Sequence, residues 1–86
     1  MIYEVFAIYD KAVKNYMVPQ FEQTKEVAIR NFKVAMNRKD LFLYMQPEDF
    51  TLYRLGEYDS KTAELKFKEP ELVCDGMSVL EEDHEV

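Results

Sequence analysis

Residues 47–59, PEDFTLYRLGEYD, carry the clearest structural signal in this chain. Residues 51–58 are rich in β-branched, aromatic and aliphatic side chains, and they are bounded by Pro47 before and Asp59 after. Such a run between turn-forming residues is typical of a β-strand. Gly56 stands inside it, which predicts a β-bulge or the close approach of another backbone. We therefore expect a bounded sheet strand with one irregular position.

Two more strands are predicted before this segment. Residues 2–9 are apolar at nearly every position, which indicates a central strand with both faces at least partly covered. Residues 16–21 predict a second, shorter strand, in which Pro19 lacks an N–H and favours an edge position or an early end. The polar residues 10–15 between them predict a hairpin.

A further hairpin is predicted after the segment, with its turn at residues 59–62. Residues 63–68 alternate between apolar and charged side chains, the pattern of a strand with one covered face. Pro70 is expected to end this strand, which leaves room for a short additional strand at residues 72–74. The side chains expected to face inward are those of Ala63, Leu65 and Phe67.

One helix is predicted from residue 25 to residue 37. Thr24 is suited to the N-cap, and Glu26 lies in the first turn, where the helix dipole favours an anion. Asn37 is expected to end the helix in a left-handed conformation. The apolar stripe at helical spacing consists of Ala28, Ile29, Phe32, Ala35 and Met36.

These elements predict an α+β fold, a small antiparallel sheet in the order β-β-α-β-β with one amphipathic helix packed on a face. A chain of 86 residues forms one domain, expected at residues 1–80, followed by a disordered acidic tail at residues 81–86. One helix leaves the other face of such a sheet uncovered. Dimerisation through the sheet edges or that second face is therefore expected.

The net charge of −6 is carried by the C-terminal part of the chain. Residues 1–69 contain all eleven Lys and Arg residues and eleven of the seventeen acids, so this part is neutral. Residues 70–86 contain the other six acids and no Lys or Arg. The acidic total therefore does not forbid an interaction with nucleic acid, because a neutral body can still present a basic face.

Residues suited to catalysis or to metal binding are scarce. His84 is the only histidine and stands in the acidic tail, while Cys74 is the only cysteine. Two glycines are too few for a glycine-rich phosphate loop. We expect no enzymatic activity, no metal and no cofactor. We also expect no membrane association, since no uninterrupted apolar run approaches the roughly 20 residues that span a bilayer; a single thiol suits a reducing cytoplasm.

Basic and aromatic side chains support a nucleic-acid interface. Single strands are held by a basic groove together with rings on which the bases stack. The predicted helix and its exit are rich in cations, and the strands carry tyrosines, among them Tyr3, Tyr9, Tyr16 and Tyr58. The candidate nucleic-acid-binding residues are Lys25, Arg30, Lys33, Arg38, Lys39, Tyr53 and Arg54.

Several short motifs together resemble one phage protein family over residues 3–67. They are Tyr9-Asp10, the set Pro19, Phe21 and Thr24, Ala28-x-Arg30-x-Phe32, and Pro47-x-Asp49-Phe50-x-Leu52-x-x-Leu55-Gly56-x-Tyr58-Asp59. The chain resembles the nonstructural, DNA-associated protein of gokushovirus-type microviruses, small phages with single-stranded DNA genomes. The resemblance implies a role in genome replication or packaging in the host cytoplasm.

The chain departs from this family at Ala63, where relatives tend to have glycine at the hairpin turn. Because alanine disfavours positive φ, we expect a type I turn without the usual glycine bulge.

Three functional hypotheses follow. The first is a non-enzymatic phage accessory protein that binds single-stranded DNA through the basic helix and exposed tyrosines. The second is a protein-interaction or assembly factor that uses the apolar residues 41–45 and the sheet edges to bind itself or another phage or host protein. The third is a regulator of host replication whose acidic tail mimics DNA.

Overall fold

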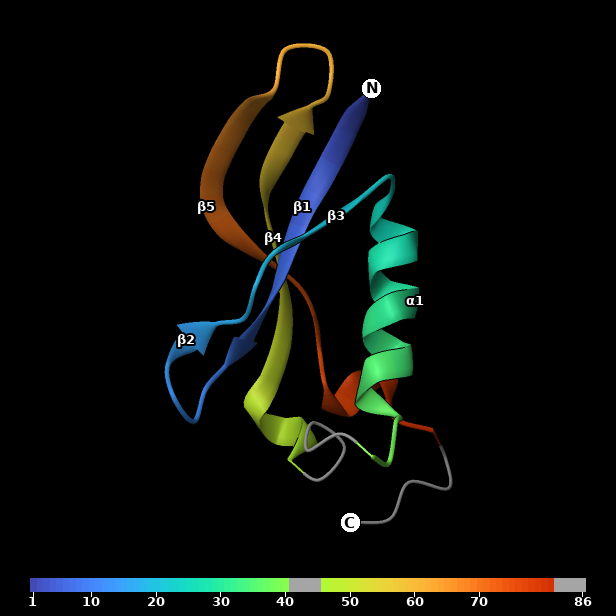
Figure 1. The fold of residues 1–86 in the computed structure, drawn as a ribbon. Helices are drawn as coiled ribbons and strands as arrows, with labels where there is room; N and C mark the ends of the chain where they lie inside the picture. Colours follow the sequence, from blue (N-terminus) through green and yellow to red (C-terminus); the bar gives the residue numbers. More distant parts are fainter. Residues whose placement is uncertain (41–45, 82–86) are drawn as a thin grey trace.

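A computed structural model describes residues 1–40 and 46–81 (Figure 1). These residues form one antiparallel sheet and one α-helix, so the predicted α+β class is confirmed. The elements are β1 (Ile2–Asp10), β2 (Asn15–Tyr16), β3 (Gln20–Glu22), α1 (Lys25–Met36), the 3₁₀ helix η1 (Pro47–Asp49), β4 (Phe50–Asp59), β5 (Glu64–Asp75) and the 3₁₀ helix η2 (Met77–Val79).

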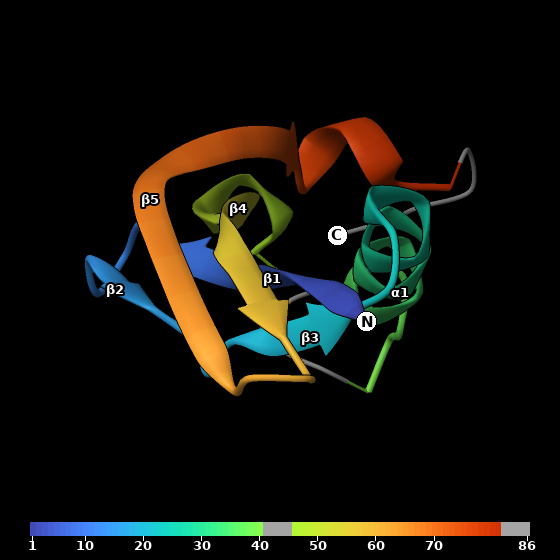
Figure 2. The same ribbon diagram turned by 90° about the horizontal axis from the view of Figure 1, so that it is seen from above.

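The strands lie in the order β2-β1-β4-β5, and β3 also pairs with β1. The predicted central strand and the antiparallel pairing of the N-terminal strands are confirmed. The predicted second strand is divided into β2 and β3, because residues 17–19 leave the ladder where Pro19 has no N–H to donate. Figure 2 shows that the sheet curls, with β5 bending around β4 towards η2.

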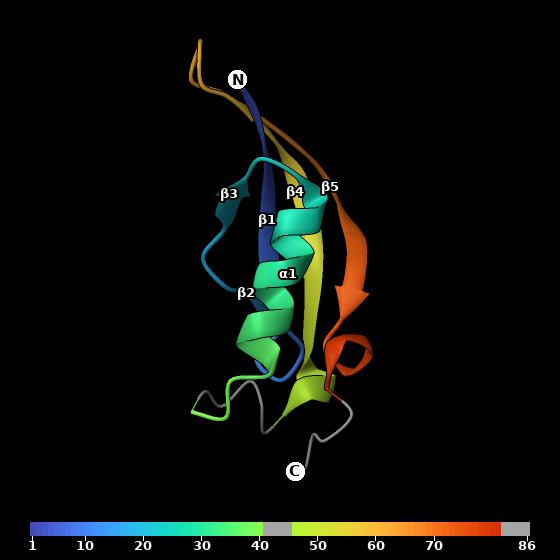
Figure 3. The ribbon, with the colours of Figure 1, turned by 90° about the vertical axis from the view of Figure 1, so that its right-hand side faces the viewer.

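The helix lies against one face of the sheet (Figure 3). Thr24 caps it as predicted, since its hydroxyl oxygen accepts a hydrogen bond of 3.2 Å from the backbone N–H of Val27. The buried side of the helix meets three sheet residues in one apolar core. This core is formed by Ala28, Phe32 and Met36 of α1 with Phe6, Phe50 and Leu52 of the sheet.

The prediction of a left-handed Asn37 is wrong, because its φ is −102°. Its side chain instead joins the end of the helix to the C-terminal segment. The amide nitrogen donates to the carbonyl of Lys33 at 2.8 Å and to that of Val79 at 2.9 Å. The amide oxygen accepts from the backbone N–H of Glu81 at 2.9 Å.

Gly56 lies at a bulge and at a close approach, as predicted. Val5 of β1 pairs with Gly56 while Phe6 pairs with Arg54, so Leu55 is the extra residue of β4. A Cβ at Gly56 would lie 2.0 Å from the carbonyl oxygen of Lys66. Only glycine leaves room for the β5 backbone at this position.

The expected conformation of the β4–β5 turn is wrong at Ala63. This alanine has a φ of +62°, the left-handed conformation that it was expected to avoid. The backbone N–H groups of Thr62 and Ala63 both donate to the carbonyl of Asp59, at 3.3 and 2.7 Å. Two strands joined over so short a turn need one residue of positive φ, and alanine adopts it here at a cost of roughly 1–2 kcal/mol.

The predicted end of the last strand is also wrong, since β5 continues through Pro70 to Asp75. Proline is tolerated because β5 is an edge strand and because a bulge lies there. Arg54 pairs with Glu71 and Gly56 with Phe67, which leaves residues 68–70 opposite Leu55. The separate strand predicted at residues 72–74 is the second half of β5.

The expected inward orientation of the first half of β5 is wrong as well. Leu65 is 47% exposed and Phe67 is 60% exposed, and Ala63 is exposed in the turn. They project from the helix-free side of an edge strand, where no second layer of the described residues covers them. The residues 82–86 of the predicted tail lie outside the described residues, as do residues 41–45.

Candidate nucleic-acid interface

Aromatic side chains gather on the helix-free face of the sheet. Residues that pair directly across antiparallel strands point to the same face. Tyr3 pairs with Tyr58 and Tyr9 with Tyr16, while Tyr53 pairs with Ala7, one strand step away from the helix-facing Leu52. We call this surface the tyrosine face; its rings are those of Tyr3, Tyr9, Tyr16, Phe21, Tyr53 and Tyr58.

Three of the rings form one cluster at the β1–β2 end, the Tyr16 cluster. The ring centroids of Tyr9 and Tyr16 are 4.8 Å apart. Tyr53 lies edge-on to both, at 6.1 Å from Tyr9 and 5.7 Å from Tyr16. These separations are those of favourable aromatic pairs, so the rings hold one another in place.

The other three rings form the Tyr58 cluster, nearer the β4–β5 turn. Phe21 lies edge-on to Tyr58 with their centroids 5.4 Å apart, and Tyr3 lies 6.3 Å from Tyr58. Phe21 reaches this face because its strand pairs with Val5 of β1. In the sequence Phe21 stands out only as part of a family motif. Its pairing with Val5, which points away from the helix, places it on this face.

Tyr16 is the most exposed tyrosine of the face, at 42%. Partial burial raises the pKa of its hydroxyl above 10.0, and the Tyr53 and Tyr9 hydroxyls raise it further because a second phenolate beside them is unfavourable. The Tyr16 side chain is therefore uncharged at neutral pH.

Three lysines lie at the two ends of the tyrosine face. Lys11 and Lys14 are in the β1–β2 connection, next to the Tyr16 cluster, and Lys61 is in the β4–β5 turn. All three are exposed, and within residues 1–40 and 46–81 none of them forms an ion pair. These lysines are not among the residues predicted from the sequence, because their nearness to the rings depends on the strand register.

The predicted helical cations lie elsewhere. Lys25, Arg30 and Lys33 are exposed on α1, and Lys39 follows the helix. The helix packs on one face of the sheet (Figure 3), and strand register turns Tyr53 to the other face. Lys25, Arg30 and Lys33 therefore lie on the opposite side of the sheet from Tyr53. The structure thus divides the candidate residues between two surfaces.

Arg38 is paired with a carboxylate. Its guanidinium donates to both carboxylate oxygens of Asp40, at 3.2 and 2.7 Å. These hydrogen bonds raise the pKa of Arg38 and lower the pKa of Asp40. A phosphate would have to displace Asp40 to reach this arginine.

Arg54 is likewise occupied, on the helix side of the sheet. Its Nε donates to Glu4 at 2.6 Å, and a terminal nitrogen lies 3.6 Å from Glu57. The arginine side chain is only 19% exposed. Neighbours in a strand point to opposite faces, so Arg54 and Tyr53 cannot contact the same base.

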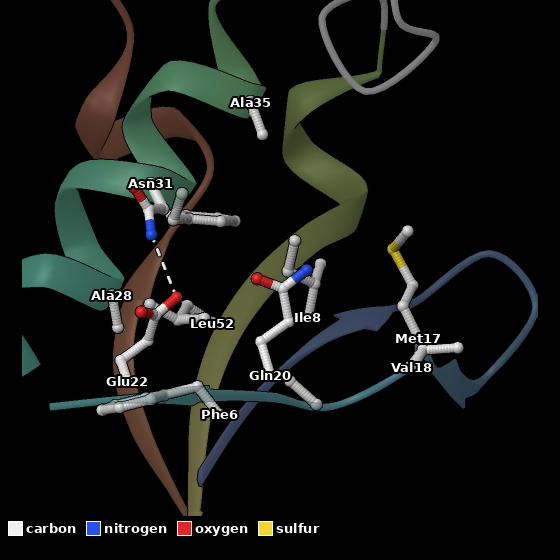
Figure 4. Close-up of a pocket in the computed structure, with 12 residues that line it drawn as sticks. Phe6, Ile8, Met17, Val18, Gln20, Glu22, Ala28, Asn31, Ala35 and Leu52 are labelled. Carbon is white, nitrogen blue, oxygen red and sulfur yellow. Dashed lines mark hydrogen bonds between the residues drawn. The ribbon is translucent and has the colours of Figure 1, made fainter. Parts of the chain in front are cut away.

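One small crevice lies between α1, β1 and the segment that follows β2 (Figure 4). Its volume is about 120 Å³, and apolar side chains such as Phe6, Ile8, Met17 and Val18 dominate its lining. At one wall Asn31 donates to Glu22 at 2.9 Å. The crevice is well below the roughly 300 Å³ of ordinary ligand sites and brings together no catalytic set.

The described residues offer little other chemistry. They contain no group of three or more His, Cys, Asp or Glu side chains that could hold a metal ion. None of the helices they form has the length and apolarity that crossing a bilayer requires. Burial, and next the carboxylate of Asp75, raise the pKa of Cys74, so this thiol is a poor nucleophile at neutral pH.

Comparison with known proteins gives one match. The family model described as "Phage ORF5 protein" matches residues 3–79. Searches of curated proteins and of solved structures found no match.

Proposed function

The chain belongs to the Phage ORF5 protein family, and we propose that it is a non-enzymatic phage accessory protein that binds single-stranded DNA. The motifs of residues 3–67 support the finer proposal of a gokushovirus-type microvirus, whose genome is single-stranded DNA. Binding would then serve genome replication or packaging in the host cytoplasm.

The observation that carries this proposal is the tyrosine face. Proteins that bind single strands commonly stack bases on aromatic side chains of an open sheet, and each stacked base contributes roughly 1–3 kcal/mol. Here the Tyr16 and Tyr58 clusters lie along the strands on a face that the helix leaves open. The two clusters can therefore stack bases from successive parts of one DNA strand.

Phosphate contacts are assigned to Lys11, Lys14 and Lys61, which lie at the ends of this face without a carboxylate partner among the described residues. Each phosphate contact contributes about −0.7 to the slope of log affinity against log salt for a single strand. Three contacts give a slope of about −2. Four contacts through the helical cations would give about −3.

The direct test replaces Tyr16, whose ring is the most exposed of the five tyrosines on this face. Tyr16→Ala should weaken binding of a labelled single-stranded oligonucleotide by about 5- to 150-fold, the equivalent of one lost stacking partner. Tyr16→Phe is the matched control, because it keeps the ring and should keep most of the affinity. Fluorescence anisotropy at two salt concentrations gives both affinities and the salt slope.

A second variant locates the binding surface. Replacing Lys25, Arg30 and Lys33 of α1 by glutamine removes three exposed charges from the opposite side of the sheet. Its affinity should fall far less than that of Tyr16→Ala. A larger loss of affinity in the helix variant than in Tyr16→Ala would place the binding site on the helix. If the wild-type protein shows no salt-sensitive binding to any oligonucleotide, the proposed function is wrong.

The alternative function, a protein-interaction or assembly factor, has one specific observation in its favour. Leu65, Phe67 and Leu72 of the edge strand β5 are exposed together. A stable complex with another phage or host protein that forms without DNA would support it. The apolar residues 41–45, on which this alternative first rested, lie outside the described residues.

A further inference from the structure

The outer edge of β5 is unpaired. The order β2-β1-β4-β5 makes β5 the last strand, and it is twelve residues long. Every residue from Glu64 to Leu72 is exposed, and Leu65, Phe67 and Leu72 are 47%, 60% and 61% exposed. A long edge with apolar side chains is a template for another strand.

The sequence of this edge is complementary to itself in the antiparallel sense. Its centre lies between Lys68 and Glu69, with basic and apolar residues on one side and acidic and apolar residues on the other. A two-fold axis at that point would place each residue of one copy opposite a complementary residue of the second. The four pairs are Leu65 with Leu72, Lys66 with Glu71, Phe67 with Pro70, and Lys68 with Glu69.

In a regular strand this pairing would fail, because residues an odd number of positions apart point to opposite faces. The bulge of β5 shifts the alternation of side chains, so that Leu65 and Leu72 point to the same face. Leu65 lies opposite Tyr58 and Leu72 opposite Tyr53, so both leucines project from the tyrosine face although seven positions separate them. Directly opposed side chains of two copies would therefore share a face.

The bulge has the same effect on the outer charged pair. Lys66 lies opposite Glu57 and Glu71 opposite Arg54. Arg54 and Glu57 face the helix side together, as their separation of 3.6 Å shows. Lys66 and Glu71 thus point to the helix side, where each can meet its counterpart from a second copy.

The charges of this edge are largely unused within one copy. Lys66 has only a contact of 3.8 Å with Glu64, at the exposed surface. Within the described residues Lys68, Glu69 and Glu71 form no ion pair. They are therefore available to a partner of complementary pattern.

We propose that two copies of this chain dimerise through their β5 strands, antiparallel about a two-fold axis between Lys68 and Glu69. Such an isologous interface is self-complementary. Here it brings Lys66 of each copy to Glu71 of the other on the helix side, and it places Lys68 opposite Glu69 within the bulge. The dimer also sets the two tyrosine faces side by side on one surface. Only this last consequence, a longer surface for one DNA strand, rests on the proposed function.

The test uses two charge-inverted variants of the full chain without DNA. The acidic variant is K66E/K68E and the basic variant is E69K/E71K. Each variant alone places like charges opposite one another, so each should sediment as a monomer at concentrations where the wild type is a dimer. An equimolar mixture restores all four opposite-charge pairs and should form a 1:1 heterodimer, which native mass spectrometry identifies.

The matched control inverts two exposed charges away from the edge, in the variant K25E/K33E, which should remain a dimer. All the replaced residues are exposed. Circular dichroism of each variant tests whether it is folded. A monomeric wild type, an acidic or basic variant that still dimerises, or a mixture without heterodimer would each overturn the proposal. Dimerisation without any DNA affinity would sustain it while ending the proposed function.

Discussion

At the scale of single residues, Gly56 and Ala63 show opposite relations between residue type and backbone. Gly56 stands where the β5 backbone comes too close for any side chain. Ala63 stands in a left-handed conformation that glycine adopts without strain. Glycine is the residue that the backbone requires at position 56, whereas the alanine at position 63 is strained. Both residues belong to the β4–β5 hairpin.

Gly56→Ala should therefore destabilise the protein strongly. The added methyl group would lie 2.0 Å from the carbonyl oxygen of Lys66 and 3.0 Å from the Cα of Phe67, both of which are backbone atoms. The β4–β5 ladder must shift to accommodate it, and we expect the free energy of unfolding to fall by about 2–4 kcal/mol. Urea unfolding followed by circular dichroism measures the change; a loss below about 1 kcal/mol would show that the strands separate easily.

Ala63→Gly should have the opposite sign. Glycine relieves roughly 1–2 kcal/mol of strain in the left-handed conformation, which stabilises the folded state. It also raises the conformational entropy of the unfolded chain, which lowers the stability by about 0.4–1 kcal/mol. The net expectation is a gain of about 0.5–1 kcal/mol in the free energy of unfolding. Ala12→Gly is the matched control in the other hairpin connection, since the φ of Ala12 is not positive, and it should destabilise slightly.

Cys74 gives a prediction on pH. Burial, followed by the carboxylate of Asp75, raises the pKa of its thiol above 9.0, so less thiolate is present at a given pH. Alkylation at pH 8 should be slower than that of a free cysteine and should accelerate when urea unfolds the chain. Because the pKa of this thiol is higher in the folded than in the unfolded chain, the folded state is favoured at pH values below the pKa of the unfolded chain. This contribution to stability is lost as the pH rises through the pKa of the folded chain. A rate profile with its midpoint at or below pH 9.0 would contradict the shift.

At the scale of elements, sequence pattern predicts those features that depend on neighbours along the chain. Thr24 begins the helix because its hydroxyl can reach an N–H three residues ahead, and the apolar stripe follows from helical spacing. The continuation of β5 through Pro70 was not predictable in this way. It depends on β5 being an edge strand, which is a property of the whole sheet.

The exposure of Leu65 and Phe67 could not be predicted from the sequence for a similar reason. Alternation of apolar and charged residues shows which side chains share a face, but not whether a second layer covers that face. For the candidate interface, the sequence identified aromatic strands and a basic helix correctly as elements. It could not show that the sheet lies between them, since that depends on which face the helix covers.

Asn37 joins the end of the helix to the C-terminal segment through hydrogen bonds to Val79 and Glu81. The variant Asn37→Ala tests how much this connection stabilises the protein. The variant loses hydrogen bonds to Val79 and Glu81 in addition to its bond within the helix. We expect the free energy of unfolding to fall by about 1–2 kcal/mol and amide exchange at Glu81 to accelerate. Asn31→Ala is the control, because it removes one exposed bond to Glu22 and should lower stability by less than about 0.5 kcal/mol.

At the scale of the whole molecule, the protein presents three distinct surfaces. Figure 2 shows α1 on one side of the curled sheet and β5 at its edge, and the strand register places the tyrosine face on the side away from α1. The molecule is elongated, with extents of 45 × 24 × 19 Å, so the sheet offers a long path for a strand of nucleic acid. Exposed residues of α1 can therefore be replaced without altering the tyrosine face or the edge of β5.

Deletion of residues 82–86 uses this separation. It removes three of the seventeen acids from a chain whose last described residue, Glu81, is bonded to Asn37 at the end of the helix. The tail therefore begins on the helix side, and five residues span at most about 17 Å. If DNA binds the tyrosine face, the deletion should raise affinity by less than about threefold at low salt, and the effect should vanish near 0.15 M salt, where the screening length is about 8 Å.

A tail that competes with DNA for the helical cations predicts a different result. Affinity would then rise by tenfold or more and would keep part of that gain at 0.15 M salt, because a competitor in direct contact is screened less than a distant charge. Combining the deletion with Tyr16→Ala separates the two cases. If DNA binds the tyrosine face, the loss caused by Tyr16→Ala should be the same with and without the tail, as expected for two independent changes. A loss that disappears when the tail is removed would place the DNA on the helix side.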